Sequence, residues 1–330
     1  DRQRCREMKI PNSKLSLLKW SVLIVIGALV PVFVKNDYYL TVMCQVLVNI
    51  VAAIGLNFIC GLTGQPMLGM AGVMALGAYV SGILTTTFNM NPWLALVFSM
   101  LMGVLLGQIL GWPSLRIRGI YLALTTIGFS EIIKLVLNNL SITGGAMGLR
   151  QIPSLSLAGF AFDSTRSYYY LYMVIVIILM ALSLKLINSR WGRAFLACRD
   201  NESAVESCGI NIVATKLTAF TLCTVYGCIA GSLYAHLMRY INPMTYTFDL
   251  SAKFLMMIML GGLGSSYGLV FGAFIVTALP EMIRFLGDYY WLTFTGLVLL
   301  LAIFCPMGVP SLFMKIVNRI SAAIAKPRRS

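Results

Sequence analysis

The sequence predicts an all-α, polytopic membrane protein with about ten transmembrane helices. The first observation is composition: 59% of the 330 residues are hydrophobic, only 11% are charged, and the mean hydropathy is +0.85. A chain with this much apolar surface cannot bury it inside a soluble core. The second observation is a series of apolar stretches close to the ~20 residues that cross a bilayer. These stretches cover residues 17–34, 38–60, 66–88, 93–111, 119–139, 168–187, 215–238, 250–264, 268–286 and 290–305.

Basic residues set the predicted orientation, because short cytoplasmic loops preferentially retain Lys and Arg. They are concentrated in an N-terminal arm (1–16) and in a tail (311–330), so both termini are predicted to be cytoplasmic. With an even number of spans, Arg116, Arg118 and the charged segment 188–214 fall on the same side. The opposite loops hold four acidic residues, Asp37, Asp163, Asp249 and Asp288.

Residues 1–330 are predicted to form a single transmembrane domain, because no change in composition marks a second soluble domain. The first apolar stretch follows a basic arm, as a signal peptide would, but no small-residue cleavage site follows it. It is therefore interpreted as a retained span. The net charge of +14 follows from topology and from contact with anionic lipid headgroups, so nucleic acid is not an expected partner. The eight cysteines form no Cys-x-x-Cys pair and are expected to be free packing residues.

A charged segment with helical periodicity separates two long apolar stretches at residues 189–209. It is predicted to form one helix from Gly192 to Gly209, and a glycine suits the left-handed turn that ends a helix. One stripe of this helix would carry Phe195, Cys198, Val205 and Cys208. A short amphipathic helix between the cytoplasmic ends of two spans can be pushed by a partner protein, which makes it a candidate coupling element. The alternative is a surface helix with no partner.

A glycine- and proline-rich interruption, Gly61-Leu-Thr-Gly-Gln-Pro66, separates the second and third apolar stretches. Such a break frees backbone groups that lipid cannot satisfy, so the segment is expected to be buried in protein or to line a polar cavity. Its candidate path-lining residues are Gly61, Gly64, Gln65 and Pro66. A similar run at 261–268 follows about 200 residues later, a weak sign of an internal repeat.

One acidic residue, Glu131, is predicted to lie well inside the bilayer, about 13 residues or ~20 Å along a helix beyond Arg118. A carboxylate at that depth is expensive and is by default a functional candidate for the transport path. The alternative is a local ion pair with Lys134, three residues further on the same helical face. The sequence leaves both interpretations open.

The longest predicted extramembrane stretch outside the charged segment runs from 141 to 167, on the side opposite the termini. Its glycines and Pro153 predict a turn-rich loop rather than a folded module. Four residues near its start, Thr143, Gly144, Gly145 and Gly148, are candidates for docking a substrate-binding protein. An ordinary connector is the alternative.

Several segments resemble, in order along residues 40–310, the LivM-type permeases of branched-chain amino acid ABC importers. They are Leu115-Arg-Ile-Arg-Gly-Ile-Tyr-Leu-Ala-Leu124, Gly128-Phe-Ser-Glu-Ile132, the Ile-Thr-Gly-Gly run at 142–145, Gly192-Arg-Ala-Phe-Leu-Ala-Cys-Arg-Asp-Asn-Glu-Ser-Ala204 with Gly209-Ile-Asn211, Lys216-Leu-Thr-Ala-Phe220, Ala230-Gly-Ser-Leu-Tyr-Ala235, Gly261-Gly-Leu-Gly264 and Pro306-Met-Gly-Val309. The chain departs from the pattern at Ile120, where an acidic residue is common, and at the two cysteines of the charged segment. These departures leave the expected architecture of an ABC importer permease unchanged but leave the substrate open.

The resemblance implies that segment 188–214 is the loop that docks into an ATPase subunit. The implied coupling residues are Gly192, Arg193, Ala194, Arg199, Asp200, Asn201, Glu202 and Gly209. Arg199, Asp200 and Glu202 are expected in the exposed part of this loop, where a partner can reach them. The loop after the fifth span is, in the same family, a docking rim for the binding protein.

The resemblance also implies the function: a permease subunit of an ATP-driven importer for branched-chain amino acids in the bacterial inner membrane. The implied partners are a homologous LivH-type permease, two ABC ATPase subunits and a periplasmic amino-acid-binding protein, within membrane lipid. No Gly-x-x-x-x-Gly-Lys-Ser/Thr phosphate loop is present and His236 is the single histidine, so neither ATP hydrolysis nor a His-rich metal site is expected on this chain. ATP and Mg²⁺ are expected on the partner subunits.

Three other functions are kept open. Importers of urea and short amides share the same permease pattern. An ion-coupled secondary transporter would need an interior carboxylate, for which Glu131 is the strong candidate. A membrane enzyme is disfavoured, because no nucleophile–base pair or metal cluster is evident in the sequence.

Overall fold

The computed structural model describes residues 36–117, 119–157, 160–161 and 164–283, together with short pieces nearer the two ends (27–29, 31, 289, 292–293, 295–296 and 299–300). The predicted N-terminal arm (1–16), the first span (17–34) and the tail (311–330) lie outside the continuously described residues. The same holds for the last span (290–305).

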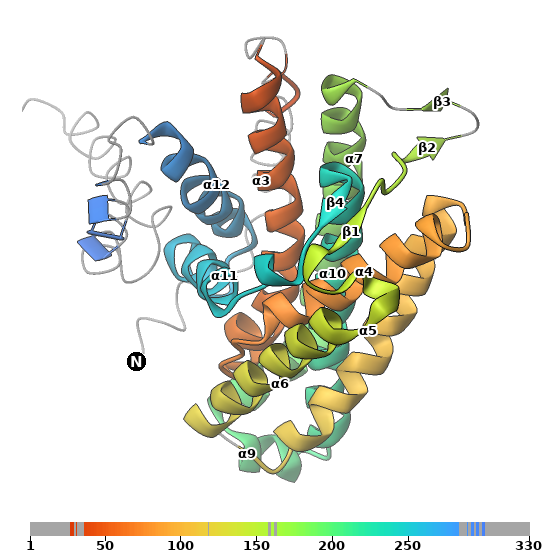
Figure 1. Ribbon diagram of the computed structural model, residues 1–330. Coiled ribbons are helices and arrows are strands. Elements are labelled where there is room, and N and C mark those ends of the chain that lie inside the picture. Colours follow the sequence, from red (N-terminus) through yellow and green to blue (C-terminus); the bar gives the residue numbers. More distant parts are fainter. Residues whose placement is uncertain are drawn as a thin grey trace, which may run out of the picture.

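The described chain is almost entirely helical (Figure 1). Its long helices are α3 (Asp37–Leu56), α4 (Met70–Thr86), α5 (Pro92–Ser114), α6 (Ile120–Asn139), α7 (Thr165–Ile187), α10 (Ile212–Met238), α11 (Phe248–Gly261) and α12 (Ser266–Met282). The short helical elements are the π-helical turn η1 (Asn57–Thr63), η2 (Ser141–Thr143), η3 (Gly145–Met147), α8 (Arg190–Asp200), α9 (Glu202–Ser207) and η4 (Pro243–Thr245). The part of the chain that the structure describes also has four two-residue strands: β1 (Leu149–Arg150), β2 (Ser156–Leu157), β3 (Phe160–Ala161) and β4 (Tyr240–Ile241).

Each of the eight predicted apolar stretches between residues 38 and 286 overlaps one of these long helices, so the helical class is confirmed for the described part of the chain. Among the described residues, five helical segments are long and apolar enough to cross a bilayer: Asp37–Thr63, Pro92–Ser114, Ile120–Asn139, Thr165–Ile187 and Ile212–Met238. Helices α4 and α12 are apolar but only 17 residues long. Helix α4 is shorter than its predicted stretch because residues 64–69 are not helical.

Helix α10 is the centre of the bundle and packs against α3, α4 and α5. Close approach depends on glycine: a Cβ placed on Gly231 of α10 would lie 2.0 Å from the Met74 carbonyl oxygen of α4. On α4, a Cβ on Gly77 would lie 2.4 Å from the Cα of Cys228. Small residues that let two backbones meet are typical of helix pairs in membranes, where apolar side chains gain little by leaving lipid.

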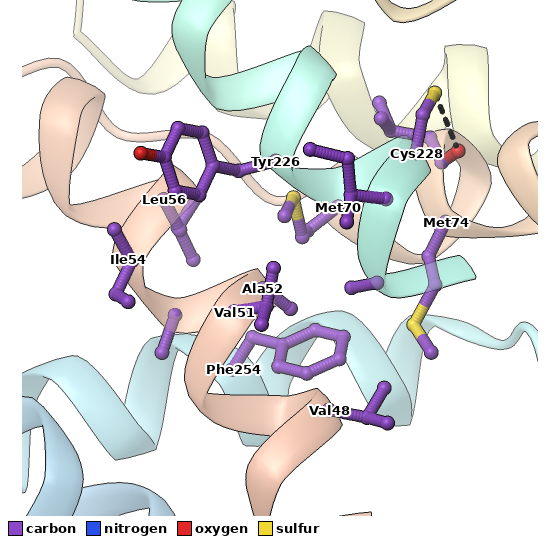
Figure 2. Close-up of a cluster of buried hydrophobic side chains, with 14 of the residues drawn as sticks. Val48, Val51, Ala52, Ile54, Leu56, Met70, Met74, Tyr226, Cys228 and Phe254 are labelled. Carbon is purple, nitrogen blue, oxygen red and sulfur yellow. Dashed lines mark hydrogen bonds between the residues drawn. The ribbon is translucent and has the colours of Figure 1, made fainter. Parts of the chain in front are cut away.

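The core lies where α3, α4, α10 and α11 meet (Figure 2). Phe254 of α11 lies beside Val48 and Val51 of α3, while Tyr226 of α10 lies near Leu56. These side chains are almost completely buried. Dense packing of this kind fixes the relative positions of the four helices, and therefore of the segments that join them.

The two ends of the bundle are closed differently. At one end, seen at the bottom of Figure 1, α8 and α9 connect α7 to α10. At the opposite end, β1 pairs antiparallel with β4, and β2 pairs with β3. We call these the α8–α9 end and the hairpin end.

Candidate functional site

The segment predicted as one helix from Gly192 to Gly209 is two helices, so that prediction is wrong in this detail. Helix α8 ends at Asp200, and Asn201 adopts an extended backbone (φ −160°, ψ 106°) before α9 begins. The Asn201 side chain accepts a hydrogen bond from the Ala204 amide (3.2 Å), as an N-cap residue does. Asparagine is a favoured N-cap residue and a poor residue for a helix interior. Asn201 therefore favours the start of a second helix over the continuation of α8.

The apolar stripe is also shorter than predicted. Phe195, Cys198 and Val205 are buried, as expected, but Cys208 is exposed because α9 ends before it. Gly209 has a positive φ (+76°), which confirms the predicted left-handed turn. The Gly209 and Ile210 amides donate to the carbonyls of Glu206 and Val205, the hydrogen-bond pattern of a Schellman motif.

The other predicted coupling residues divide between packing and exposed positions. Gly192 and Ala194 are buried, and a Cβ on Gly192 would lie 1.9 Å from the Ile187 carbonyl oxygen. Arg193, Arg199, Asp200 and Asn201 are exposed, as predicted for Arg199 and Asp200. The side chains that a partner can reach are therefore on the outer face of α8.

Glu202 differs from the expectation of a fully exposed docking residue. Its carboxylate lies 2.8 Å from Lys216 Nζ of α10, and the side chains of Lys216 and Glu202 are 4% and 28% exposed, respectively. An almost buried ammonium needs a charged partner, since the cost of leaving it unpaired is several kcal/mol, roughly 3–5 for a buried pair. The Glu202 side chain thus holds α9 against α10.

Arg199 joins α8 to the interrupted helix. Its Nη1 donates to the Gly61 carbonyl oxygen at 2.7 Å. A Cβ placed on Gly64 would lie 3.0 Å from Arg199 Cγ, so the aliphatic part of the arginine covers this glycine. The coupling segment and the helix break, two separate predictions from sequence, are parts of one site.

The interruption predicted at Gly61–Pro66 is observed, but it begins three residues later than predicted, because residues 61–63 are still helical. The helix of α3 widens into the π-helical turn η1, Gly64 has a positive φ (+70°), and residues 64–69 are not helical before α4 starts at Met70. Protein groups satisfy much of the freed backbone: the amide of Leu68 donates to Thr126 Oγ1 and that of Ala71 to Ser251 Oγ, both at 3.0 Å. The expectation that protein surrounds the break is confirmed for these groups.

Gly64, Gln65 and Pro66 are at least partly accessible, whereas Gly61 is buried. Gln65 Oε1 is a buried atom that has no hydrogen-bond partner among the described residues. A buried acceptor of this kind is costly unless another molecule satisfies it.

The two glycine-rich runs that the sequence singled out lie next to each other. The Gly264 amide donates to Asn57 Oδ1 at 3.0 Å, and a Cβ on Gly61 would lie 2.8 Å from the Gly264 nitrogen. The turn between α11 and α12 therefore rests on η1. The run at 261–268 therefore has a structural role at the site. The predicted internal repeat stays a prediction.

Glu131 forms the local ion pair that was the alternative to a functional carboxylate. Its Oε2 lies 2.8 Å from Lys134 Nζ on the next turn of α6, and the Glu131 side chain is 40% exposed. Among the described residues, no contact joins this carboxylate to Arg199 or to residues 61–66. The structure therefore does not bring it together with the other predicted path residues.

The predicted docking loop is held against the hairpin end. Thr143 is buried, and its hydroxyl donates to the Leu137 carbonyl oxygen at 2.5 Å. Gly148 has a φ of +72°, and a Cβ placed on it would lie 2.1 Å from the Ile241 carbonyl oxygen. Gly144 and Gly145 also have positive φ and form the turns between η2 and η3. The loop is turn-rich, as predicted, and its glycines are required by backbone geometry.

Sequence reasoning missed Asn57, Lys216 and Thr126 as parts of the site. Asn57 had a signal, because an amide in an otherwise apolar span is expensive and needs a partner. Lys216 had no such signal, because it is the second residue of the predicted span 215–238, where a lysine commonly reaches the interface. Nothing local marks Thr126, whose role depends on the approach of the Leu68 amide.

The two cysteines of the segment give a direct test of its structure. Burial raises the pKa of the Cys198 thiol, the Glu202 carboxylate raises it further, and the Lys216 ammonium lowers it. A higher pKa leaves less thiolate at neutral pH, and the thiolate is the reacting species. In purified protein we expect iodoacetamide to modify exposed Cys208 at least about tenfold faster than Cys198, measured by peptide mass spectrometry.

Urea denaturation serves as the control for this labelling, because it should equalise the two rates. Equal rates in the native protein would contradict the buried position of Cys198 on α8.

Together these features define a multi-pass α-helical membrane protein in which a broken helix meets a short connecting helix at one end of the bundle. A family model described as "Branched-chain amino acid transport system / permease component" matches residues 38–303. The chain belongs to this family of transport permeases.

Individual relatives agree with the family. The high-affinity branched-chain amino acid transport system permease protein LivM of Escherichia coli (strain K12) is 34% identical over 287 residues, covering 80% of this chain and 68% of the relative. The LivH permease of the corresponding system in Salmonella typhimurium is 23% identical over 244 residues, covering 68% and 78%. The autoinducer 2 import system permease protein LsrC of Yersinia pseudotuberculosis serotype O:1b is 26% identical over 237 residues, covering 67% and 65%. No solved structure matches the chain.

Proposed function

We propose that this chain is the LivM-type membrane-spanning subunit of an ATP-driven importer for branched-chain amino acids in the bacterial inner membrane. The family match over residues 38–303, together with 34% identity to a LivM permease, carries this proposal. LivM and LivH relatives are both named as permeases of a high-affinity branched-chain amino acid system, which supports a LivH-type partner. Two ATPase subunits with ATP and Mg²⁺, and a periplasmic amino-acid-binding protein, complete the proposed complex.

In the proposed orientation the α8–α9 end and both termini are cytoplasmic, and the hairpin end is periplasmic. The outer face of α8, with Arg193 and Asp200, would dock the ATPase, while the loop at 143–148 would form part of the binding-protein rim. Lys185, Arg190, Arg193 and Arg199 lie at the α8–α9 end, and short cytoplasmic loops preferentially retain Lys and Arg, which supports this assignment. We propose Gly61, Gly64, Gln65 and Pro66 as part of the transport path, with the unpartnered Gln65 Oε1 as a group that cargo or water can satisfy.

The identity of the transported solute is tested by uptake of radiolabelled leucine. The cells express the whole complex and lack other leucine carriers. We expect excess unlabelled leucine, isoleucine or valine to compete, and urea and short amides not to compete. Autoinducer 2 belongs among the competitors, since a relative is named for its import. Competition by urea, a short amide or autoinducer 2 instead would reassign the solute within the same family.

The energy source separates an ABC importer from an ion-coupled transporter. We expect uptake to stop when ATP is depleted and to persist when an uncoupler collapses the proton gradient while ATP is maintained. We also expect Glu131→Gln to keep most activity, because Glu131 is paired with Lys134 rather than placed at the broken helix. Uptake that follows the ion gradient and is lost in Glu131→Gln would favour the ion-coupled alternative.

ATPase docking is tested best at Asp200, because the half-buried Glu202 has a structural partner within this chain. We expect Asp200→Lys to reduce co-purification of the ATPase subunits, since it reverses an exposed charge at the end of α8 without breaking the Glu202–Lys216 pair. Lys185→Glu, an exposed charge reversal on α7, is the matched control. Unchanged ATPase recovery and full uptake in Asp200→Lys would remove this part of α8 from the docking surface.

A further inference from the structure

The contact between Arg199 and η1 has an electrostatic cause. Gly61 lies in the last turn of a helix, where the final four carbonyl groups have no partner in a regular helix and carry partial negative charge. The Arg199 guanidinium supplies both a donor and a positive charge, with Nη1 2.7 Å from the Gly61 oxygen. Such a charge-assisted hydrogen bond is stronger than one between neutral groups.

The same arginine is also packed against the chain break. Because Gly64 has no side chain, the stem of Arg199 can lie over it, with Cγ only 3.0 Å from where a Cβ would be. Arg199 therefore contacts Gly61 within η1 and Gly64 immediately after it. Both glycines belong to the segment Gly61–Pro66.

The connection continues beyond η1. Asn57 is 2% exposed, and its Oδ1 accepts a hydrogen bond from the Gly264 amide in the turn between α11 and α12. Gly61 rests on the same turn, because a Cβ there would lie 2.8 Å from the Gly264 nitrogen. A continuous set of contacts thus runs from α8 through η1 to the α11–α12 turn.

We propose that Arg199 is a positioning residue that transmits movement of α8 to the broken segment 64–69 and, through Asn57, to the α11–α12 turn. The proposal rests on the proposed function, in which an ATPase pushes on α8. Phe195 and Cys198 of α8 are buried, and Glu202 holds the neighbouring α9 to α10. Loss of the Arg199 side chain should therefore leave α8 and its exposed Arg193 and Asp200 in place. Removal of the Arg199 contact should separate ATP hydrolysis from transport.

Two substitutions isolate the hydrogen bond. Arg199→Met keeps an aliphatic stem over Gly64 but removes the charged donor, whereas Arg199→Lys keeps a charged donor. In the complete complex reconstituted with binding protein in liposomes, we expect Arg199→Met to retain ATPase subunits and ATP hydrolysis. The number of solute molecules that this variant transports per ATP hydrolysed should fall about tenfold, the loss expected for one charge-assisted hydrogen bond. Arg199→Lys should recover part of that loss, and Lys185→Ala, on α7, should behave as the unmodified chain.

The outcomes distinguish the two proposals. If the unmodified chain neither binds ATPase subunits nor transports with ATP, the proposed function fails. If the unmodified complex works and Arg199→Met transports the same amount per ATP, the positioning role of Arg199 fails alone. Loss of ATPase subunits from Arg199→Met would also overturn it, because Arg199 would then act in docking.

Hydrogen exchange on the unmodified complex gives a measurement that needs no variant. Binding of a non-hydrolysable ATP analogue should change amide exchange in 190–200, 57–69 and 261–266 together, and should leave most of α5 unchanged. A change in 190–200 without any change in 57–69 would overturn the proposal.

Discussion

Gly231→Ala is expected to lower the melting temperature of the purified protein by about 2–4 °C. The added methyl group would lie 2.0 Å from the Met74 carbonyl oxygen and 2.8 Å from the Ala78 nitrogen, both backbone atoms of α4. Backbone cannot rotate away as a side chain does, so α4 and α10 would have to separate by roughly 1 Å. Overpacking of this kind costs about 1–3 kcal/mol or more, and α10 packs against three other helices.

Gly128→Ala is the matched control for this prediction. Gly128 is also inside a helix, α6, but a Cβ there meets nothing within 4 Å. Alanine is favoured over glycine in a helix interior by about 0.8–1 kcal/mol, so the control should leave the melting temperature unchanged or raise it slightly. Thermal unfolding followed by intrinsic fluorescence in the same detergent measures both variants. Equal melting temperatures would show that α4 and α10 are not in close contact.

The class of fold could be predicted from composition, because a chain this apolar has few places other than lipid in which to bury its side chains. Stretches of about 20 apolar residues must enter lipid, and helices form there since each backbone group must find an internal partner. The interruption at Gly61–Pro66 was visible for the same reason: glycine and proline change the backbone locally. Asn201 followed by acidic Glu202 is an N-cap signal, but the prediction followed the continuous helical period and missed it.

The contacts of the site could not be predicted from local sequence. Arg199 and Gly61 are 138 residues apart, and their hydrogen bond depends on how α7 and α10 place α8 beside η1. The partner of Lys216 likewise depends on the direction in which the chain leaves Asn201. Periodicity identifies which face of a helix is apolar, but tertiary packing decides which charged group on the other face finds a partner within the chain.

Gly64→Leu is expected to block uptake while the complex still assembles. Gly64 has a left-handed backbone (φ +70°), which costs a non-glycine residue roughly 1–2 kcal/mol. A leucyl side chain would also enter the space of the Arg199 stem, 3.0 Å from the Cβ position, and so displace the contact that joins α8 to η1. Because Gly64 is exposed at the end of η1, the core should tolerate the change. Uptake of labelled leucine and recovery of ATPase subunits are measured on the same preparations.

Two comparisons separate the causes of the expected block. Gly64→Asn introduces a residue that adopts the left-handed conformation more readily, so it should retain more uptake than leucine if backbone strain contributes. Gly82→Ala, on α4 at the hairpin end, should be nearly normal, because its new methyl group meets the tips of Leu149, Ile152 and Ile241, which can move. Normal uptake in Gly64→Leu would contradict a role for the broken segment in the transport path, since a side chain of that size cannot occupy the position without moving η1 or Arg199.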